Sequence, residues 1–163
     1  MITKQQFIDN FVKEIDIIRH LATKVTPDML DYRPHEKQRS MLELLNYLGH
    51  IFTVGVELNI EGNMGKYAEL TSNVPVVTLE NFDMLMEAQA KAVAARIEAL
   101  TDAELTEEYE IFGRSASRAM HIFGVMKWTV AYKMQLFLYI KANGNHDIST
   151  INLWAGVDAA PKN

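Results

Sequence analysis

The sequence predicts an all-α protein that folds as an antiparallel four-helix bundle. Apolar residues recur at helical spacing in four long segments, near residues 3–25, 40–61, 79–100 and 115–142. Capping-box patterns stand at Thr3 with Gln6, at Ser40 with Glu43 and at Thr101 with Glu104. The second and fourth segments are apolar on nearly every side, which is typical of helices buried within a bundle.

The first two helices have clear ends in the sequence. Segment 3–25 keeps its apolar residues on one face, and Thr26-Pro27-Asp28 ends it because proline disfavours helix at the residue before it. Ser40 and Glu43 start the second helix, and Gly62 is suited to cap its C-terminus. A loop is expected over 67–75, and residues 62–78 are long enough for a crossover connection.

The third helix is expected to begin near Thr78 or Leu79 and to end near Leu100. A short turn follows Thr101, residues 107–112 are expected to be extended, and Gly113 breaks the chain. The fourth helix then runs from about Ser115 to Ala142. The tail over 147–158 looks irregular, but its Ile, Leu and Trp residues predict that it docks on the bundle.

Length and composition limit the class of protein. A chain of 163 residues suits a single domain, 1–163, and 48% hydrophobic with 23% charged residues is typical of a soluble protein. The net charge of −5 argues against nucleic-acid binding. Charged residues such as Lys127 and Lys133 interrupt the richest apolar stretch, which argues against a membrane span. With no cysteine and no signal-peptide pattern at the N-terminus, we expect a cytoplasmic protein.

Two motifs resemble the DinB/YfiT-like family of four-helix bundles. The first is Arg33-Pro34-His35 followed by Ser40 and the Glu43-Leu44-Leu45 helix, within residues 28–52. The second is Ala131-Tyr132-Lys133-Met134-Gln135-Leu136, where typical members carry His-Arg-Gly-Gln-Leu. The segment 151–156 is similar to the one that closes the family's fold. The resemblance implies a bundle, association as a homodimer and a divalent metal held by three histidines.

The positions that match the family's three histidines are aromatic in this chain. They are Tyr47 on the second helix and Trp128 and Tyr132 on the fourth. An imidazole donates a lone pair to a metal, whereas an indole does not and a neutral phenol is a poor ligand. Lys133 also replaces the arginine beside them and removes its bidentate fork. We therefore predict no metal at the usual family positions and no cofactor, with His50 as the remaining plausible ligand.

Five residues are candidates for a small-molecule cleft between the second and fourth helices. Tyr47 and His50 share one helix face, and Trp128, Tyr132 and Gln135 lie along one stripe. Aromatic walls with a few polar groups are typical of ligand sites. The alternative is a core in which the aromatic residues only fill space, an interpretation favoured for His121 and, to a smaller degree, for Trp128.

The other histidines carry weaker signals. His20 is expected at the surface, His35 in loop packing, and His146 near a helix C-terminus, where a cation is favourable. A metal site from His35, His146 and Asp147 has no supporting spacing. The sequence holds no nucleophile elbow, phosphate loop or dinucleotide fingerprint.

Three functional hypotheses follow. The first is a degenerate family member without metal that binds a small molecule in the cleft between helices. The second is a metal-dependent hydrolase or thiol-dependent transferase with a displaced Zn or Ni site that uses His50. The third is a non-catalytic interaction protein that forms a dimer, because the fourth helix has more apolar surface than one side of a bundle buries.

Overall fold

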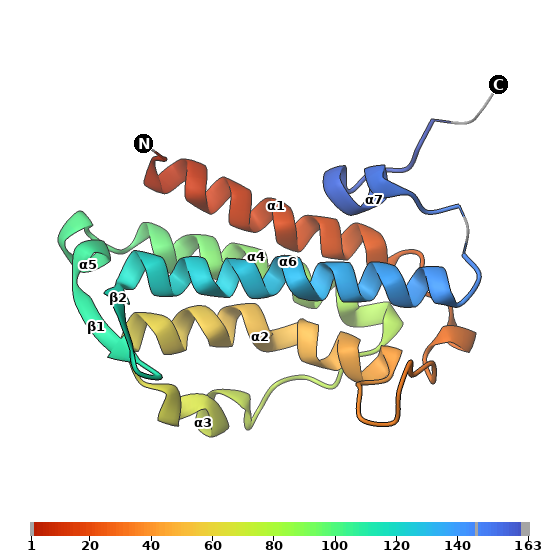
Figure 1. Cartoon of the computed structure of the whole chain (residues 1–163), viewed down its shortest axis with the longest axis horizontal. Helices are drawn as coiled ribbons and strands as arrows, with labels where there is room; N and C mark the ends of the chain where they lie inside the picture. Colours follow the sequence, from red (N-terminus) through yellow and green to blue (C-terminus); the bar gives the residue numbers. More distant parts are fainter. Residues whose placement is uncertain (1, 146, 161–163) are drawn as a thin grey trace.

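Four long helices pack side by side along the length of the molecule (Figure 1). The computed structural model describes residues 2–145 and 147–160. The helices are α1 (Lys4–Ala22), α2 (Met41–Glu61), α4 (Leu79–Glu98) and α6 (Arg118–Ala142). α4 and α6 occupy opposite corners of the bundle, and each packs against both α1 and α2. The predicted four-helix bundle is therefore confirmed.

The helix directions correct one part of the prediction, because the bundle is not antiparallel throughout. Side-chain contacts join residue 46 to 77 and Glu57 to Arg96, so the neighbours α2 and α4 run parallel. Lys4 contacts the end of α4 and Arg19 contacts its start, so α1 and α4 run antiparallel. The connection over 62–78 returns along the bundle, as Figure 1 shows, and confirms the predicted crossover.

Helix α2 is the central apolar element, as its sequence predicted. Its buried side chains include Leu44, Leu48 and Phe52. Buried Gln89 of α4 bonds directly to the α2 backbone: its Nε2 donates to the carbonyl of Leu48 at 2.8 Å, and its Oε1 accepts from the amide of Phe52 at 3.0 Å. In a regular helix these two backbone groups bond to each other. The Gln89 carboxamide therefore sets how α4 lies along α2.

The predicted helix starts at Thr3, Ser40, Thr78 and Thr101 are confirmed. In each case the side chain of the capping residue accepts from a backbone amide and completes a capping box. Gly62 ends α2 with a left-handed φ of 66°, as its sequence position predicted.

Several connecting segments differ from the predictions. The expected loop at 67–75 contains α3 (Tyr67–Thr71), which follows the 3₁₀ turn Met64–Lys66. A second 3₁₀ turn lies at Pro27–Met29, and α5 spans Asp102–Thr106. Residues expected to open the fourth helix instead form strand β2 (Arg114–Ser117), which pairs antiparallel with β1 (Glu108–Ile111). The Ser117 hydroxyl caps α6, so this helix begins at Arg118 and not at Ser115.

The C-terminal tail docks on the bundle, as predicted, but it is not entirely irregular. It forms α7 (Thr150–Ala155), because Ser149 and Asn152 make a capping box and Gly156 caps the end with a φ of 68°. Asp158 pairs with Lys24 at 2.7 Å, and Leu153 is buried. Within the described residues, no helix is both long enough and apolar enough to cross a membrane.

We predict that Gln89→Ala lowers the free energy of unfolding by about 2–4 kcal/mol, because three buried hydrogen bonds and packed volume are lost. Denaturant unfolding followed by circular dichroism measures the change. Gln5→Ala is the matched control, since Gln5 is exposed. A loss below about 0.5 kcal/mol, the range of ordinary surface substitutions, would contradict the role given to Gln89.

Candidate functional site

Three of the predicted cleft residues meet between α2 and α6. The rings of Tyr47 and Tyr132 lie 4.9 Å apart between centroids and are tilted by 56°. The His50 ring lies 6.0 Å from the Tyr47 ring in an edge-on arrangement. All three side chains are partly exposed, so this cluster reaches the surface and is not part of a closed core.

Arg39 completes this cluster from the segment before α2. Its guanidinium carbon lies 4.1 Å from the centre of the Tyr47 ring, which is a cation–π contact. The backbone carbonyl of Arg39 accepts a hydrogen bond from the Tyr139 hydroxyl at 2.9 Å. Gln135 in turn donates to that hydroxyl at 2.8 Å. Residues of α6 therefore fix the position of Arg39 through its backbone.

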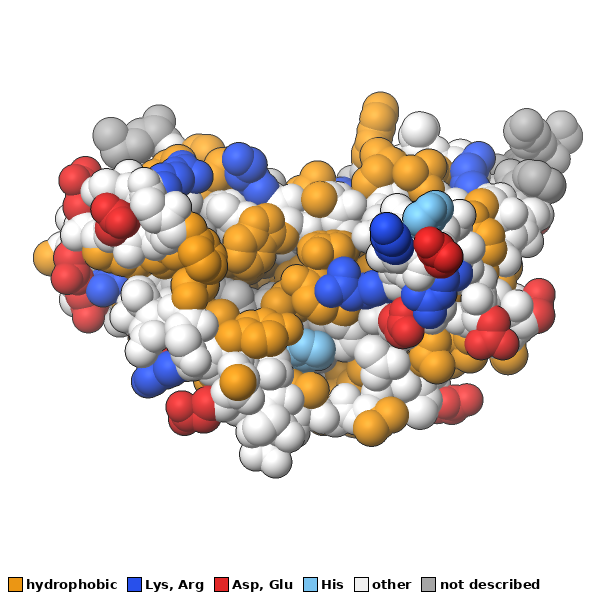
Figure 2. Space-filling model, turned by 60° about the horizontal axis from the view of Figure 1, so that its bottom comes forward, with side chains coloured by type: hydrophobic (Ala, Val, Ile, Leu, Met, Phe, Trp, Pro, Cys, Tyr) orange, Lys and Arg blue, Asp and Glu red, His pale blue; other side chains and the backbone are white. Residues whose placement is uncertain are grey.

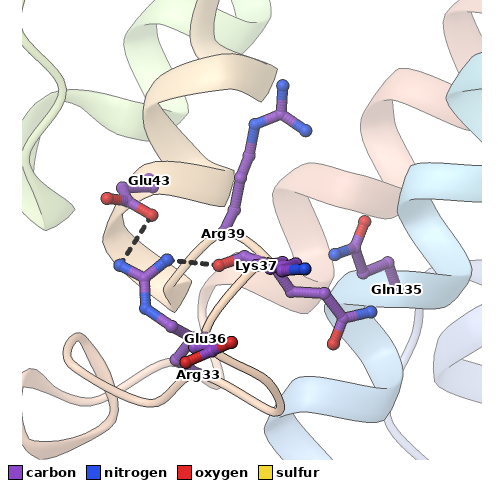
Figure 3. Close-up of a pocket in the computed structure, with 7 residues that line it drawn as sticks. Arg33, Glu36, Lys37, Arg39, Glu43 and Gln135 are labelled. Carbon is purple, nitrogen blue, oxygen red and sulfur yellow. Dashed lines mark hydrogen bonds and ion pairs between the residues drawn. The ribbon is translucent and has the colours of Figure 1, made fainter.

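The segment before α2 also encloses an open cavity of 460 Å³ (Figure 3). Arg33 pairs with Glu43 at 2.9 Å and donates to the carbonyl of Gln38, which holds the segment against the start of α2. Figure 3 shows the Arg39 side chain extending away from this pair. The cavity is lined by Arg33, Glu36, Lys37, Gln38, Arg39, Glu43 and Gln135.

Some of the charged side chains near the cavity form ion pairs and others do not. The Arg33 guanidinium and the Ser40 amide, both bonded to the Glu43 carboxylate, lower the pKa of Glu43. Glu43 thus remains ionised and largely neutralises Arg33. Among the described residues, no acidic side chain pairs with Arg39 or Lys37. The cavity therefore has two cationic groups available to a ligand.

The cluster keeps its titratable rings neutral. Burial and the hydrogen bond with Tyr132 raise the pKa of Tyr47 well above its usual value of 10.0. Burial lowers the pKa of His50 below 6.5, and the positive charge of Arg39 acts in the same direction. A neutral His50 has one ring nitrogen as a donor and the other as an acceptor. The cluster can therefore supply hydrogen bonds beside the fixed charge of Arg39.

The remaining predicted cleft residues lie elsewhere. Gln135 lines the cavity of Arg39 and takes no part in the contact between Tyr47 and Tyr132. Trp128, which is 43% exposed, lines a second cavity of 260 Å³ together with His121 and Met120. The structure thus brings Tyr47, His50 and Tyr132 into one cluster, connects Gln135 to it through Arg39, and separates Trp128 from it.

The residues at the family's metal positions do not fit a metal ion. Tyr47 is held as a neutral phenol by its raised pKa, and the Arg39 cation lies over its ring. No group of three His, Asp or Glu side chains suited to a metal occurs in residues 2–145 and 147–160. Lys133 is buried and pairs with Glu14 of α1 at 2.5 Å, so it packs between helices.

The other histidines occupy structural positions. His20 lies 3.1 Å from the amide of Asn152 and 3.4 Å from Asp158, so it contacts the docked tail and is not a free surface residue. Nδ1 of exposed His35 accepts from the Lys37 amide at 3.2 Å, within the segment before α2. His121 is buried, in line with its interpretation as a core residue. His146 lies outside the described residues.

Arg39 is a site residue that the sequence did not indicate. Its position next to the capping residue Ser40 indicated only a loop, and its partners Tyr139 and Gln135 are about a hundred residues away in the sequence. Glu36 and Glu43 lie three and four residues from it, so its local sequence is that of an ordinary surface cation with acidic neighbours. No pattern of that kind distinguishes it from a solvated surface arginine.

Comparison with known proteins finds similarity to the protein YjoA in both sequence and solved structure. The uncharacterized protein YjoA of Bacillus subtilis (strain 168) is 23% identical over 151 residues, which cover 91% of this chain and 96% of YjoA. The crystal structure of YjoA, described as a DinB-like protein, superposes with a TM-score of 0.69 and 24% identity. The match covers 88% of this chain and 95% of that one. No protein-family profile matches the sequence.

The crossover bundle is therefore the DinB-like fold, in agreement with the resemblance found in the sequence. More particularly, the chain is similar to YjoA in sequence and in fold over nearly the full length of both. The likeness establishes the fold and no activity, because YjoA is itself uncharacterized.

We predict that the imidazole of His50 titrates below pH 6.5, because burial and the Arg39 charge both disfavour its protonated form. A folded-state pKa below the unfolded one stabilises the fold above pH 6.5, and this contribution is lost as the pH falls through the folded pKa. An NMR titration of the ring protons measures the pKa. Arg39→Gln should raise it, and Lys141→Gln, a change outside the cluster, should not. A midpoint at or above 6.5 in the wild type would contradict this environment.

Proposed function

We propose that the protein binds a small organic anion, without a metal, between the segment 33–39 and helices α2 and α6. One observation carries the proposal. The guanidinium of Arg39 has no acidic partner among the described residues, its backbone is fixed by α6, and it lies 4.1 Å over the Tyr47 ring beside a 460 Å³ cavity. A positioned, unpaired guanidinium is a receptor for carboxylate or phosphate.

The surrounding residues suit a ligand with both a charge and an apolar part. The cation–π contact occupies one face of the guanidinium and leaves its N–H edge for bidentate hydrogen bonds. Lys37 adds a second cation to the cavity lining. The Tyr47 ring, in contact with Tyr132, lies against the Arg39 guanidinium and offers an apolar surface next to the cavity. The ligand class that matches is a small carboxylic acid or phosphate ester with an apolar group.

The alternative enzyme hypothesis has less support. A metal-dependent hydrolase or thiol-dependent transferase with a displaced Zn or Ni site needs further ligands around His50. The ring neighbours of His50 in the cluster are tyrosines, and the nearby charge is the cation Arg39. A cation next to the site raises the cost of binding a divalent ion there.

We predict that Arg39→Gln weakens the binding of phenyl phosphate about tenfold or more, since a charge-assisted hydrogen bond contributes about 1.5–3 kcal/mol. Isothermal titration calorimetry measures the affinity, with neutral benzyl alcohol as the uncharged comparison. Lys141→Gln is the matched control, because Lys141 also lies over an aromatic ring, Phe137, but outside the cavity. Equal affinity of wild type and Arg39→Gln, or no binding by either, would overturn the proposal.

A second candidate function is self-association, favoured by the solvent face of α6. Its exposed side chains are mostly apolar, with Met120, Trp128, Val130, Met134 and Leu138 each 41–54% exposed. The solvent faces of α1 and α4 carry charges instead, such as Lys13 and Lys91. Figure 2 shows hydrophobic side chains gathered across the middle of the molecule, with most acidic side chains nearer its ends.

The spacing on α6 fits a second copy of the same helix. The α6 face consists of the half-buried Gly124 and of seven exposed residues, Met120, Lys127, Trp128, Val130, Ala131, Met134 and Leu138. Each large residue has a partner at the same sequence distance on the other side of Thr129: Met120 matches Leu138, and Trp128 matches Val130. The small residue Gly124 likewise matches Met134. A two-fold axis beside Thr129 would therefore pair two antiparallel α6 helices, with apolar residues opposite apolar ones and Gly124 leaving room for Met134.

We predict a homodimer through the α6 face at micromolar concentration, dissociated by Leu138→Glu because each new carboxylate would be buried without a partner charge against Met120 of the other copy. Sedimentation velocity measures the mass of both proteins. Ala142→Glu is the matched control, since this exposed alanine lies at the end of the same helix, outside the α6 face. A wild type that stays monomeric, or a Leu138→Glu variant that remains dimeric, would contradict the arrangement.

A further inference from the structure

The turn between β1 and β2 has an unfavourable residue at its first position. Ile111 pairs with Arg114, so the loop consists of the two residues Phe112 and Gly113. Both have positive φ, 51° and 71°, as in a type I′ hairpin turn. Gly113 suits its position, whereas the position of Phe112 favours Asn, Asp or Gly. A bulky residue with positive φ is strained, so this phenylalanine costs the fold stability.

No packing in the fold compensates for this cost. The Phe112 side chain is 85% exposed, the most exposed of the large hydrophobic residues in the described part of the chain. Phe112 instead stands at the edge of the second cavity, which it lines together with Ile111, Arg114 and Trp128. A strained and exposed aromatic residue beside a cavity points to a contact that forms only when the cavity is filled.

The cavity has the composition of a small-ligand site. Its volume is 260 Å³, and its apolar lining comes from Met64, Ile111, Phe112, Met120 and Trp128. Methionine side chains adapt to irregular apolar ligands, and aromatic rings stack on flat ones. At about 30 Å³ for each water molecule, the space corresponds to roughly nine waters, close to the size of a two-ring aromatic molecule. It shares no lining residue with the cavity of Arg39.

Two polar groups give the cavity a directional character. The Nε2 of His121 lies 3.1 Å from the carbonyl of Tyr109 and its ring stacks on Tyr109 at 4.7 Å, so a neutral His121 donates through Nε2 and keeps Nδ1 as an acceptor. Arg114 lies on β2 directly after the turn, and within the described residues it forms no ion pair. A guanidinium at the rim of an apolar pocket favours a ligand with a carboxylate at one end.

We propose that this second cavity is a binding site for small aromatic carboxylic acids, closed over the ligand by Phe112. The aromatic part lies among Met120, Trp128 and Met64, and the carboxylate faces Arg114 at the rim. Phe112 covers the ligand from the turn, which gives its exposed ring the apolar contact that the fold does not provide. The strained backbone of Phe112 then has a role, because it keeps the ring at the mouth of the cavity.

The test is a titration of the full chain with 2-naphthoate, with 2-naphthol as the neutral probe. Calorimetry should show that Phe112→Asn weakens binding of both probes about tenfold, because the burial of one aromatic side chain is lost. Arg114→Gln should weaken naphthoate binding more than naphthol binding. In NMR spectra, naphthoate should shift the indole N–H signal of Trp128 and leave that of Trp154 on α7 unmoved, with Trp154→Phe assigning the two signals.

Controls separate this proposal from folding effects and from the proposed Arg39 site. Phe112→Asn should raise the melting temperature by about 2–4 °C, because asparagine suits the positive φ of the turn. Val76→Asn removes another exposed apolar side chain and should change neither the affinity for naphthoate nor the melting temperature. Arg39→Gln should leave naphthoate binding unchanged, since Arg39 does not line the second cavity. Unchanged naphthoate binding in Phe112→Asn, or a shift of Trp154 alone, would overturn the proposal.

Discussion

The contact of Gln89 with the backbone of α2 is the constraint on which the arrangement of the bundle depends. Two parallel helices cannot be joined by a short turn, so their relative position must be set by contacts along their length. Asn46 bonds to the backbone of Val77 near one end, Gln89 bonds near the middle, and Arg96 pairs with Glu57 near the other. Of these contacts, that of Gln89 alone is fully buried and bonds to main-chain atoms. α2 is thereby held where Tyr47 and His50 face α6.

The aromatic cluster holds a cation that belongs to the chain, at positions that match metal-binding histidines in the family it resembles. Histidines at the family's positions would create a place for a metal cation, whereas Tyr47 and Tyr132 create an electron-rich surface that holds the guanidinium of Arg39. Burial raises the pKa of Tyr47, so its ring attracts this cation through the ring quadrupole and not as an ionised phenolate. The positive charge at this site thus belongs to the chain itself and remains available to an anion.

The sequence predicted most of the fold because its signals there are local. Capping residues such as Ser40 fixed helix starts, since the cap and its partner lie three residues apart. The extended segment predicted at 107–112 contains β1, but the pairing with β2 was missed because Phe112 is not a usual turn residue. Helix α7 was missed because Asn152 replaces the usual Glu or Gln of a capping box. The helix directions and the role of Arg39 depend on contacts between distant residues, which periodicity does not encode.

The two apolar features of α6 are physically linked, because they use the same side chains. Met120, Gly124 and Trp128 belong to the α6 face and also line the second cavity. If two copies pair through this face, the partner helix covers the mouth of the cavity, and a bound ligand alters the surface that the partner contacts. Association and ligand binding then change each other's affinity by the same factor, as thermodynamic reciprocity requires. The Arg39 site shares none of these residues, so the charged and apolar ends of the bundle can bind ligands independently.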